Sequence, residues 1–99
     1  PTSYIKYFKN KIINIHPSLL PKYGGKGMYG QFVHRKVIEN KEIKSGITIH
    51  FVNEKYDEGK IIFQKDIEIK EPKTSDSLAN QIHKLEMKYF PLIIEKLIS

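Results

Sequence analysis

Residues 45–69 have the sequence SGITIHFVNEKYDEGKIIFQKDIEI, in which a turn signal separates two alternating apolar runs. The first run extends from Ile47 to Phe51, and its apolar residues fall on one face of a strand because successive side chains point to opposite sides. The alternation returns over residues 61–69, after Asp-Glu-Gly at 57–59. This pattern predicts an antiparallel hairpin, and so a fold built on a sheet.

The segments on either side extend the sheet and add helices. Residues 11–15 form a short apolar run between turn signals, which is typical of a parallel core strand. Residues 28–40 have helical spacing, and a long packing helix is expected from Thr74 as N-cap, with a break or a kink at Pro91. Residues 1–8 are expected to form a short amphipathic helix behind a polar cap. The predicted class is therefore α/β, with a mixed sheet, a terminal hairpin and flanking helices.

The composition limits the classes of protein that this chain can represent. Its 99 residues make one small domain, and the lack of Cys excludes disulfides and thiolate metal sites. The net charge of +6 comes mainly from dispersed Lys, with Arg35 as the single Arg, whereas nucleic-acid sites favour clustered Arg. The sequence has no run of membrane-spanning length and no signal-peptide core. We expect a soluble cytoplasmic protein without a nucleic-acid or membrane partner.

An amide, an imidazole and a carboxylate follow the expected strands. Asn14 and His16 end the first strand, and Asp57 lies in the turn of the hairpin. Taken singly, each is more simply explained as a turn or loop residue, because Asn and Asp often bond neighbouring backbone groups. Taken together they suit acyl transfer: Asn can donate to an oxyanion, His can move a proton near neutral pH, and Asp can orient the His. None of the three needs a metal, and the His spacing does not favour one.

Three stretches give a more specific interpretation. They are NIHPSLLPKYGGKGMYG at 14–30, SGITIHFVNEKYDEGKIIFQ at 45–64 and LEMKYFP at 85–91. In this order they resemble the carboxyl-terminal half of the phosphoribosylglycinamide formyltransferases, which are folate-dependent enzymes of purine biosynthesis. The resemblance implies that residues 1–99 form a single domain, the carboxyl-terminal catalytic half of a Rossmann-like formyltransferase fold. It also implies that the amino-terminal nucleotide-binding half is absent.

The same resemblance implies a reaction and the residues that carry it. A formyl group would pass from 10-formyltetrahydrofolate, as co-substrate, to the amine of glycinamide ribonucleotide, without a metal. Asn14, His16 and Asp57 match the catalytic set, and Glu86 matches the carboxylate that binds the ribose hydroxyls of the substrate. The loop that lies against the folate pterin corresponds to Asn53, Glu54, Lys55, Tyr56 and Asp57. Taken alone, Glu86 would be interpreted as a solvated charge on a helix face.

The remaining histidines are given structural roles. His50 matches a family position close to the site, but an inward histidine on a strand more often has a structural role, so we do not include it in the catalytic set. His34 and His83 are expected on helix surfaces.

Two alternatives stay open. Formyltetrahydrofolate deformylase and methionyl-tRNA formyltransferase share the Asn, His and Asp set, although the sequence around these residues looks most like the glycinamide enzyme. A tRNA enzyme is also expected to continue into a further basic domain. The other alternative is an inactive binding fragment of the same fold, and the isolated chain is not expected to be fully active without the missing half.

Overall fold

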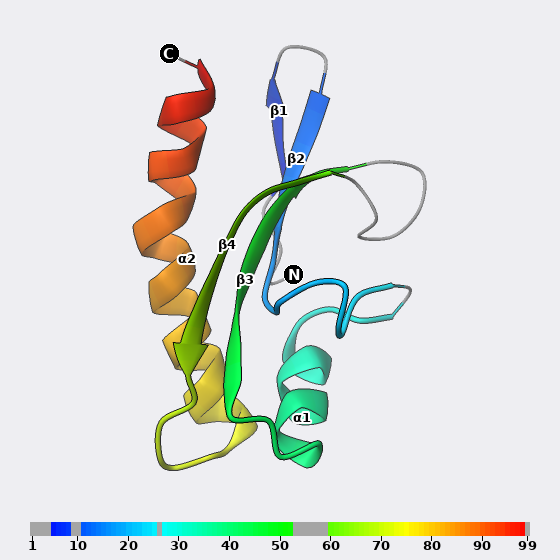
Figure 1. Ribbon diagram of the computed structural model, residues 1–99, viewed down its shortest axis with the longest axis vertical. Coiled ribbons are helices and arrows are strands. Elements are labelled where there is room, and N and C mark those ends of the chain that lie inside the picture. The colour runs from blue at the N-terminus through cyan, green and yellow to red at the C-terminus, as the bar shows by residue number, and fades with distance from the viewer. Residues whose placement is uncertain (1–4, 9–10, 26, 53–59, 99) are drawn as a thin grey trace.

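The computed structural model describes residues 5–8, 11–25, 27–52 and 60–98, which form one sheet and two helices (Figure 1). The strands are β1 (Ile5–Phe8), β2 (Lys11–His16), β3 (Lys44–Phe51) and β4 (Ile61–Glu68), and the helices are α1 (Gln31–Glu39) and α2 (Ser75–Ile98). The sheet order is β1-β2-β3-β4, so each described strand pairs with the next one along the chain. The predicted α/β class with flanking helices is confirmed.

β2 confirms the strand expected over residues 11–15, but the direction of its pairing differs from the expectation. It runs antiparallel to both β1 and β3. A short apolar run marks a strand that is buried on both faces, and it carries no information about the direction of the neighbours. The connection between the strands sets the direction. After β2, a loop and then α1 lead the chain back to the sheet, so that β3 runs opposite to β2.

The amino-terminal helix expected over residues 1–8 is wrong for the part of it that the structure describes. Ile5–Phe8 is β1, and it pairs with β2 from Ile5 opposite Asn14 to Phe8 opposite Lys11. Ile, Tyr and Phe are favoured in strands, and pairing with β2 supplies ladder hydrogen bonds. These tertiary contacts outweigh the weak amphipathic spacing.

β3 and β4 form the predicted antiparallel hairpin. Lys44 lies opposite Glu68 and Ile49 opposite Phe63, with an irregularity in the register between Ile49 and His50. β3 is a central strand and is buried over residues 45–50, whereas β4 is mostly exposed or half-buried. The turn predicted at 57–59 lies outside the described residues.

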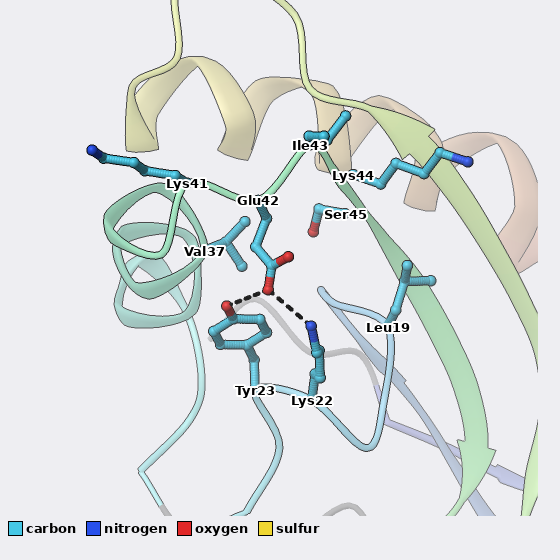
Figure 2. A pocket seen from close by; sticks show the side chains of 9 residues that line it. All are labelled: Leu19, Lys22, Tyr23, Val37, Lys41, Glu42, Ile43, Lys44 and Ser45. Carbon is cyan, nitrogen blue, oxygen red and sulfur yellow. Dashed lines mark hydrogen bonds and ion pairs between the residues drawn. The ribbon is translucent and has the colours of Figure 1, made fainter.

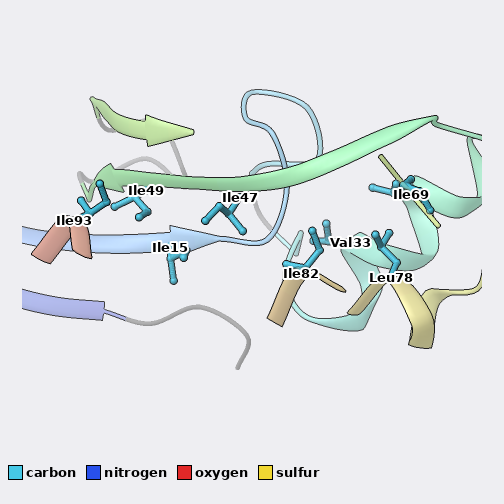
Figure 3. Packing of buried hydrophobic residues seen from close by; sticks show 9 residues of the cluster. Ile15, Val33, Ile47, Ile49, Ile69, Leu78, Ile82 and Ile93 are labelled. Atoms are coloured by element: carbon cyan, nitrogen blue, oxygen red, sulfur yellow. The ribbon is translucent and has the colours of Figure 1, made fainter. Parts of the chain in front are cut away.

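Odd-numbered residues of the two central strands, β2 and β3, form the apolar core with the helices. Ile15, Ile47 and Ile49 pack with residues of both helices in one buried cluster (Figure 3). The cluster is completed by Val33 and Val37 of α1, Ile69 after β4, and Leu78, Ile82 and Ile93 of α2. Because side chains alternate along a strand, Asn14 and His16 of β2 and Thr48 and His50 of β3 point to the opposite side of the sheet.

α2 begins where it was predicted to begin but continues past the expected break. The Ser77 N–H donates to Thr74 Oγ1 at 3.2 Å, which confirms Thr74 as the N-cap. The helix then runs through Pro91 to Ile98. A proline removes the backbone bond to the residue four positions earlier, here Met87, and both residues are exposed, so water can bond the released carbonyl. Over the described ranges, neither helix is long and apolar enough to cross a membrane.

Candidate active site

Four polar side chains lie together on the face of the sheet that points away from the apolar cluster. β2 contributes Asn14 and His16, and β3 contributes Thr48 and His50. The antiparallel register places Asn14 opposite His50 and His16 opposite Thr48, so both pairs are cross-strand neighbours. All four are buried, with Asn14 the most exposed at 8%. Buried polar groups in such numbers require defined hydrogen-bond partners.

The contact between Asn14 and His50 fixes the orientation of both side chains. His50 Nδ1 lies 3.0 Å from the Phe51 carbonyl oxygen, and His50 Nε2 lies 3.4 Å from Asn14 Nδ2. A carbonyl oxygen only accepts, so Nδ1 carries the proton of the neutral ring and Nε2 accepts from the Asn14 amide. Asn14 Oδ1 is buried and has no hydrogen-bond partner within the described ranges.

His16 is held by the loop that follows it. Its Nε2–H donates to the backbone carbonyl oxygen of Tyr23 at 2.7 Å. Tyr23 has a φ of 58°, in the left-handed region that residues with side chains rarely adopt. Its hydroxyl donates to Glu42 at 2.7 Å, and Lys22 donates to the same Glu42 oxygen at 3.2 Å (Figure 2). The Tyr23 hydroxyl also accepts from Asn40 at 2.8 Å. These contacts hold the strained turn against His16.

The same network has an electrostatic effect. The hydrogen bond from Tyr23, followed by that from Lys22, holds the pKa of Glu42 below its usual value. Glu42 is therefore a charged acceptor at neutral pH, and hydrogen bonds to a charged group are stronger than neutral ones.

A cavity of about 490 Å³ lies beside this network, between the loop, the end of α1 and the start of β3 (Figure 2). One of its lining residues is Ser45, which is near the opposite end of β3 from His50. Tyr23 lines the cavity, but Asn14 and His16 do not.

His34 is not on the surface of α1, as was expected. It is buried beside Val33 and Val37, with 2% of its area exposed. Burial, followed by the charge of His16, lowers the pKa of His34 to about 4, so the ring is neutral at neutral pH. His34 Nδ1 has no hydrogen-bond partner in the part of the chain that the structure describes.

Glu86 is buried on α2 rather than solvated. It is 4% exposed and lies on the stripe of α2 that carries Ile82 and Ile93. Burial raises the pKa of its carboxyl to about 7. Its Oε1 is 3.8 Å from Nδ1 of His83, an exposed residue one turn earlier, and its Oε2 has no hydrogen-bond partner among the described residues.

The structure brings together two of the three predicted catalytic residues, Asn14 and His16. Asp57 and the rest of the predicted folate loop, residues 53–57, lie outside the described residues. Among the side chains that the structure describes, no three His, Cys, Asp or Glu residues form a group that could hold a metal ion.

The sequence interpretation omitted His50 from the site. Its contact with Asn14 depends on the register between β2 and β3, which are separated by a loop and a helix. The available signal was the alternation within β3, which places His50 and Thr48 opposite the apolar face. That signal becomes useful only when β2 is known to be the neighbouring strand.

Comparison with known proteins supports these observations. Residues 1–94 match the protein family described as Formyl transferase. The chain is 42% identical over 103 residues to the chloroplastic phosphoribosylglycinamide formyltransferase of Arabidopsis thaliana, covering 100% of this chain and 35% of that protein. It is 44% identical over 95 residues to the phosphoribosylglycinamide formyltransferase of Bacillus subtilis, covering 96% of this chain and 46% of that protein. The chain thus spans less than half the length of these relatives.

A solved structure agrees with this match. The crystal structure of phosphoribosylglycinamide formyltransferase from Bacillus halodurans superposes with a TM-score of 0.77 at 36% identity, covering 88% of this chain and 42% of that chain. The family match extends over nearly the whole sequence, and the Bacillus halodurans enzyme shares the fold of the part that it covers. The chain therefore belongs to the formyl transferase family.

Proposed function

We propose that residues 1–99 are the carboxyl-terminal catalytic half, as a single domain, of an enzyme that transfers a formyl group from 10-formyltetrahydrofolate to the amine of glycinamide ribonucleotide. The observation that carries the proposal is the placement of Asn14 and His16 on one buried face at the end of β2. The names of relatives at 42% and 44% identity support glycinamide ribonucleotide as the formyl acceptor.

In the proposed mechanism, Asn14 and His16 stabilise the negative charge that develops on the formyl oxygen when the amine attacks the formyl carbon. Asn14 donates through the N–H that does not face His50. His16 donates in its protonated form, and the contact of its Nε2 with the Tyr23 carbonyl oxygen orients the ring. Preorganised donors in a site with little water contribute several kcal/mol to such a transition state. The bond from the formyl carbon to the folate nitrogen then breaks, and the proton lost by the attacking nitrogen passes to the departing one.

Asp57 and Glu86 complete the proposed site. Asp57 favours the charged His16 imidazole and helps to relay the proton, directly or through a water. Residues 53–57 lie against the folate pterin. Glu86 binds the ribose hydroxyls, and its buried Oε2, which lacks a hydrogen-bond partner within the described ranges, supports a ligand role because buried carboxylate oxygens usually have partners.

A chimera tests the proposal. Residues 1–99 replace the matching carboxyl-terminal segment of the Bacillus subtilis relative, which supplies the amino-terminal half. The purified chimera is given 10-formyltetrahydrofolate with glycinamide ribonucleotide, with methionyl-tRNA or with water alone, and the formylated products and free formate are measured. The parent enzyme and the same enzyme cut before this segment are the positive and negative controls.

Each outcome assigns a function. Formylated glycinamide ribonucleotide supports the proposal. Release of formate alone indicates a deformylase, and formylation of methionyl-tRNA indicates the tRNA enzyme. A chimera that binds folate in a calorimetric titration but gives no product with any acceptor indicates an inactive binding fragment. The proposal also includes a cytoplasmic location, which cell fractionation tests; the relatives from Arabidopsis thaliana and Vigna unguiculata are named as chloroplastic.

A further inference from the structure

We propose that Thr48 and Gln64 are positioning residues for His16, because together they fix the loop that returns from β2 to the imidazole. Neither residue is in the predicted catalytic or binding sets. The inference rests on the proposed function for the role of His16, whereas the contacts that carry it do not depend on that function.

Thr48 sits at the base of the loop and uses its full hydrogen-bonding capacity. Its side chain is completely buried. The hydroxyl donates to the Ser18 carbonyl oxygen at 2.7 Å, and it accepts from the Leu20 N–H at 3.0 Å and from Gln64 Nε2 at 2.9 Å. One donated and two accepted bonds are all that a hydroxyl can make. Thr48 therefore holds the loop backbone at two points without an unsatisfied group.

Gln64 braces the same loop from the next strand. The register places His16 opposite Thr48 and Thr48 opposite Gln64, so the three residues form a row across β2, β3 and β4. In addition to its bond to Thr48, Gln64 Nε2 donates to the Leu20 carbonyl oxygen at 2.9 Å. Both backbone groups of Leu20 are thus bonded to this pair of side chains.

The fixed loop places a hydrogen-bond acceptor against the imidazole of His16. Ser18 Oγ donates to the Lys22 carbonyl oxygen at 3.0 Å, which closes the loop one residue before Tyr23. The Tyr23 carbonyl oxygen then lies 2.7 Å from His16 Nε2. Because a carbonyl oxygen only accepts, this contact keeps a proton on Nε2 and fixes the orientation of the ring. The ring is oriented before substrate binds, and misplacement of a catalytic group lowers the rate steeply.

The test compares three variants with a matched control. Thr48→Val keeps the volume of the side chain and removes all three bonds, Thr48→Ser keeps the hydroxyl, and Gln64→Leu removes the brace at an exposed position. The control is Thr74→Val, which also removes a threonine hydroxyl that bonds backbone but lies at the start of α2. Thr74→Val lowers stability through loss of an N-cap, so it separates a general loss of stability from a local effect.

The first measurement is heteronuclear NMR of the histidine ring nitrogens in the 99-residue chain, with the His16 signals assigned by their absence in His16→Gln. In the unchanged chain, Thr48→Ser and Thr74→Val, we expect one tautomer with a slowly exchanging Nε2 proton. In Thr48→Val we expect a mixture of tautomers with fast exchange, and Gln64→Leu should show a smaller change in the same direction. If Thr48→Val does not fold, the His16 tautomer in Gln64→Leu decides whether the proposal holds. An unchanged His16 tautomer in the folded variants overturns the proposal.

The second measurement is the activity of the same variants in the chimera. Thr48→Val should lower kcat roughly tenfold to a hundredfold while KM for either substrate changes by less than about twofold, and Thr48→Ser should recover most of the activity. A shifted His16 tautomer with unchanged kcat overturns the positioning role. If the chimera with the unchanged chain has no transfer activity, the proposed function fails, and the NMR comparison still decides whether Thr48 and Gln64 orient His16.

Discussion

Asn14 and His50 face each other across β2 and β3, with Asn14 Nδ2 3.4 Å from His50 Nε2. The two ends of an amide have nearly the same shape, and this contact decides which end of Asn14 carries its donors toward β3. A protonated imidazole has two donors and no acceptor, so only neutral His50 can receive the bond. His50 therefore belongs to the site through its effect on Asn14, although it was not in the predicted catalytic set.

The proposed transition-state donors give the first prediction. In the chimera, replacement of Asn14, His16 or Asp57 by Ala should lower turnover by about a hundredfold or more, because each variant loses an interaction that strengthens in the transition state. The denaturation midpoint should change little. Asn80→Ala, at an exposed position on α2, is the control and should keep full turnover. Near-normal turnover of the His16 variant would contradict the mechanism.

Buried His34 and Glu86 should have opposite effects on stability as the pH changes. The pKa of His34 is lowered from 6.5 to about 4. Its contribution to the free energy of unfolding is therefore lost as the pH falls through that range, where the unfolded chain takes up the proton. The pKa of Glu86 is raised from 4.5 to about 7, so its contribution is lost as the pH rises through that range. Each effect is on the order of 3 kcal/mol, and the two oppose each other where the ranges overlap.

Single variants should expose each slope. Relative to the unchanged chain, the free energy of unfolding of Glu86→Gln should rise with pH between 4.5 and about 7. That of His34→Gln should fall, relative to the same reference, as the pH rises between about 4 and 6.5. Urea denaturation at a series of pH values measures both differences. In the double variant, the free energy of unfolding itself should no longer change with pH through either group. Parallel curves for the Glu86 variant and the unchanged chain would mean that this carboxyl titrates normally.

Ligand binding separates the two possible roles of Glu86. In the chimera, Glu86→Gln should weaken the binding of glycinamide ribonucleotide and leave folate affinity nearly unchanged, because a carboxylate accepts two hydroxyl hydrogen bonds and an amide does so less well. Calorimetric titration of each ligand separately measures this difference. Equal losses for both ligands would assign Glu86 to the maintenance of the fold.

Gly46 is expected to tolerate no side chain. A Cβ at this position would overlap the Lys65 carbonyl oxygen and lie 2.7 Å from Leu19 Cδ2 and 2.9 Å from Asp66 Cα. Because two of these atoms belong to the backbone of β4, Gly46→Ala should force the hairpin apart and lower the unfolding free energy by roughly 2 kcal/mol or more. Gly27→Ala is the comparison: Gly27 has a φ of 83° with open space around it, so only backbone strain of about 1 kcal/mol is expected. Equal losses in urea denaturation would refute the steric explanation.

The chain alone should lack efficient transfer activity, because it matches only 46% of the Bacillus subtilis relative. Without the other half the reactants are not held at attack distance, and positioning accounts for roughly 7 to 11 kcal/mol of such a barrier. Addition of the separately produced amino-terminal half of that relative should restore transfer. A high rate from the chain alone, unchanged by the added half, would contradict the assignment of residues 1–99 as half of the catalytic domain.

Local sequence patterns predicted most of the elements. The alternation from Ile47 to Phe51 located the hairpin, and helical spacing located α1 and α2. The patterns failed where long-range pairing decides the structure, as at residues 5–8, which are strand because β2 lies beside them. They failed at Pro91 because the helix there is exposed and the released carbonyl can be hydrated.

The site was predicted in part for the same reason. Asn14 and His16 are two residues apart on one strand, so their common face follows from alternation alone. The contact of Asn14 with His50 and the row from His16 to Gln64 require the strand order and register, which no local pattern contains. The burial of His34 was available in principle, since it neighbours Val33 and Val37 on the apolar stripe of α1.

Because each described strand pairs with the next one along the chain, the sheet can assemble in stages as the polypeptide leaves the ribosome. β3 finds its first partner in β2, which has already been synthesised, and β4 then closes on β3 as a hairpin. Chains dominated by pairing between sequence neighbours fold faster than chains that must join distant strands, because less loop entropy is lost before contacts form. In a longer polypeptide, this order would let the segment fold without waiting for strand partners outside it.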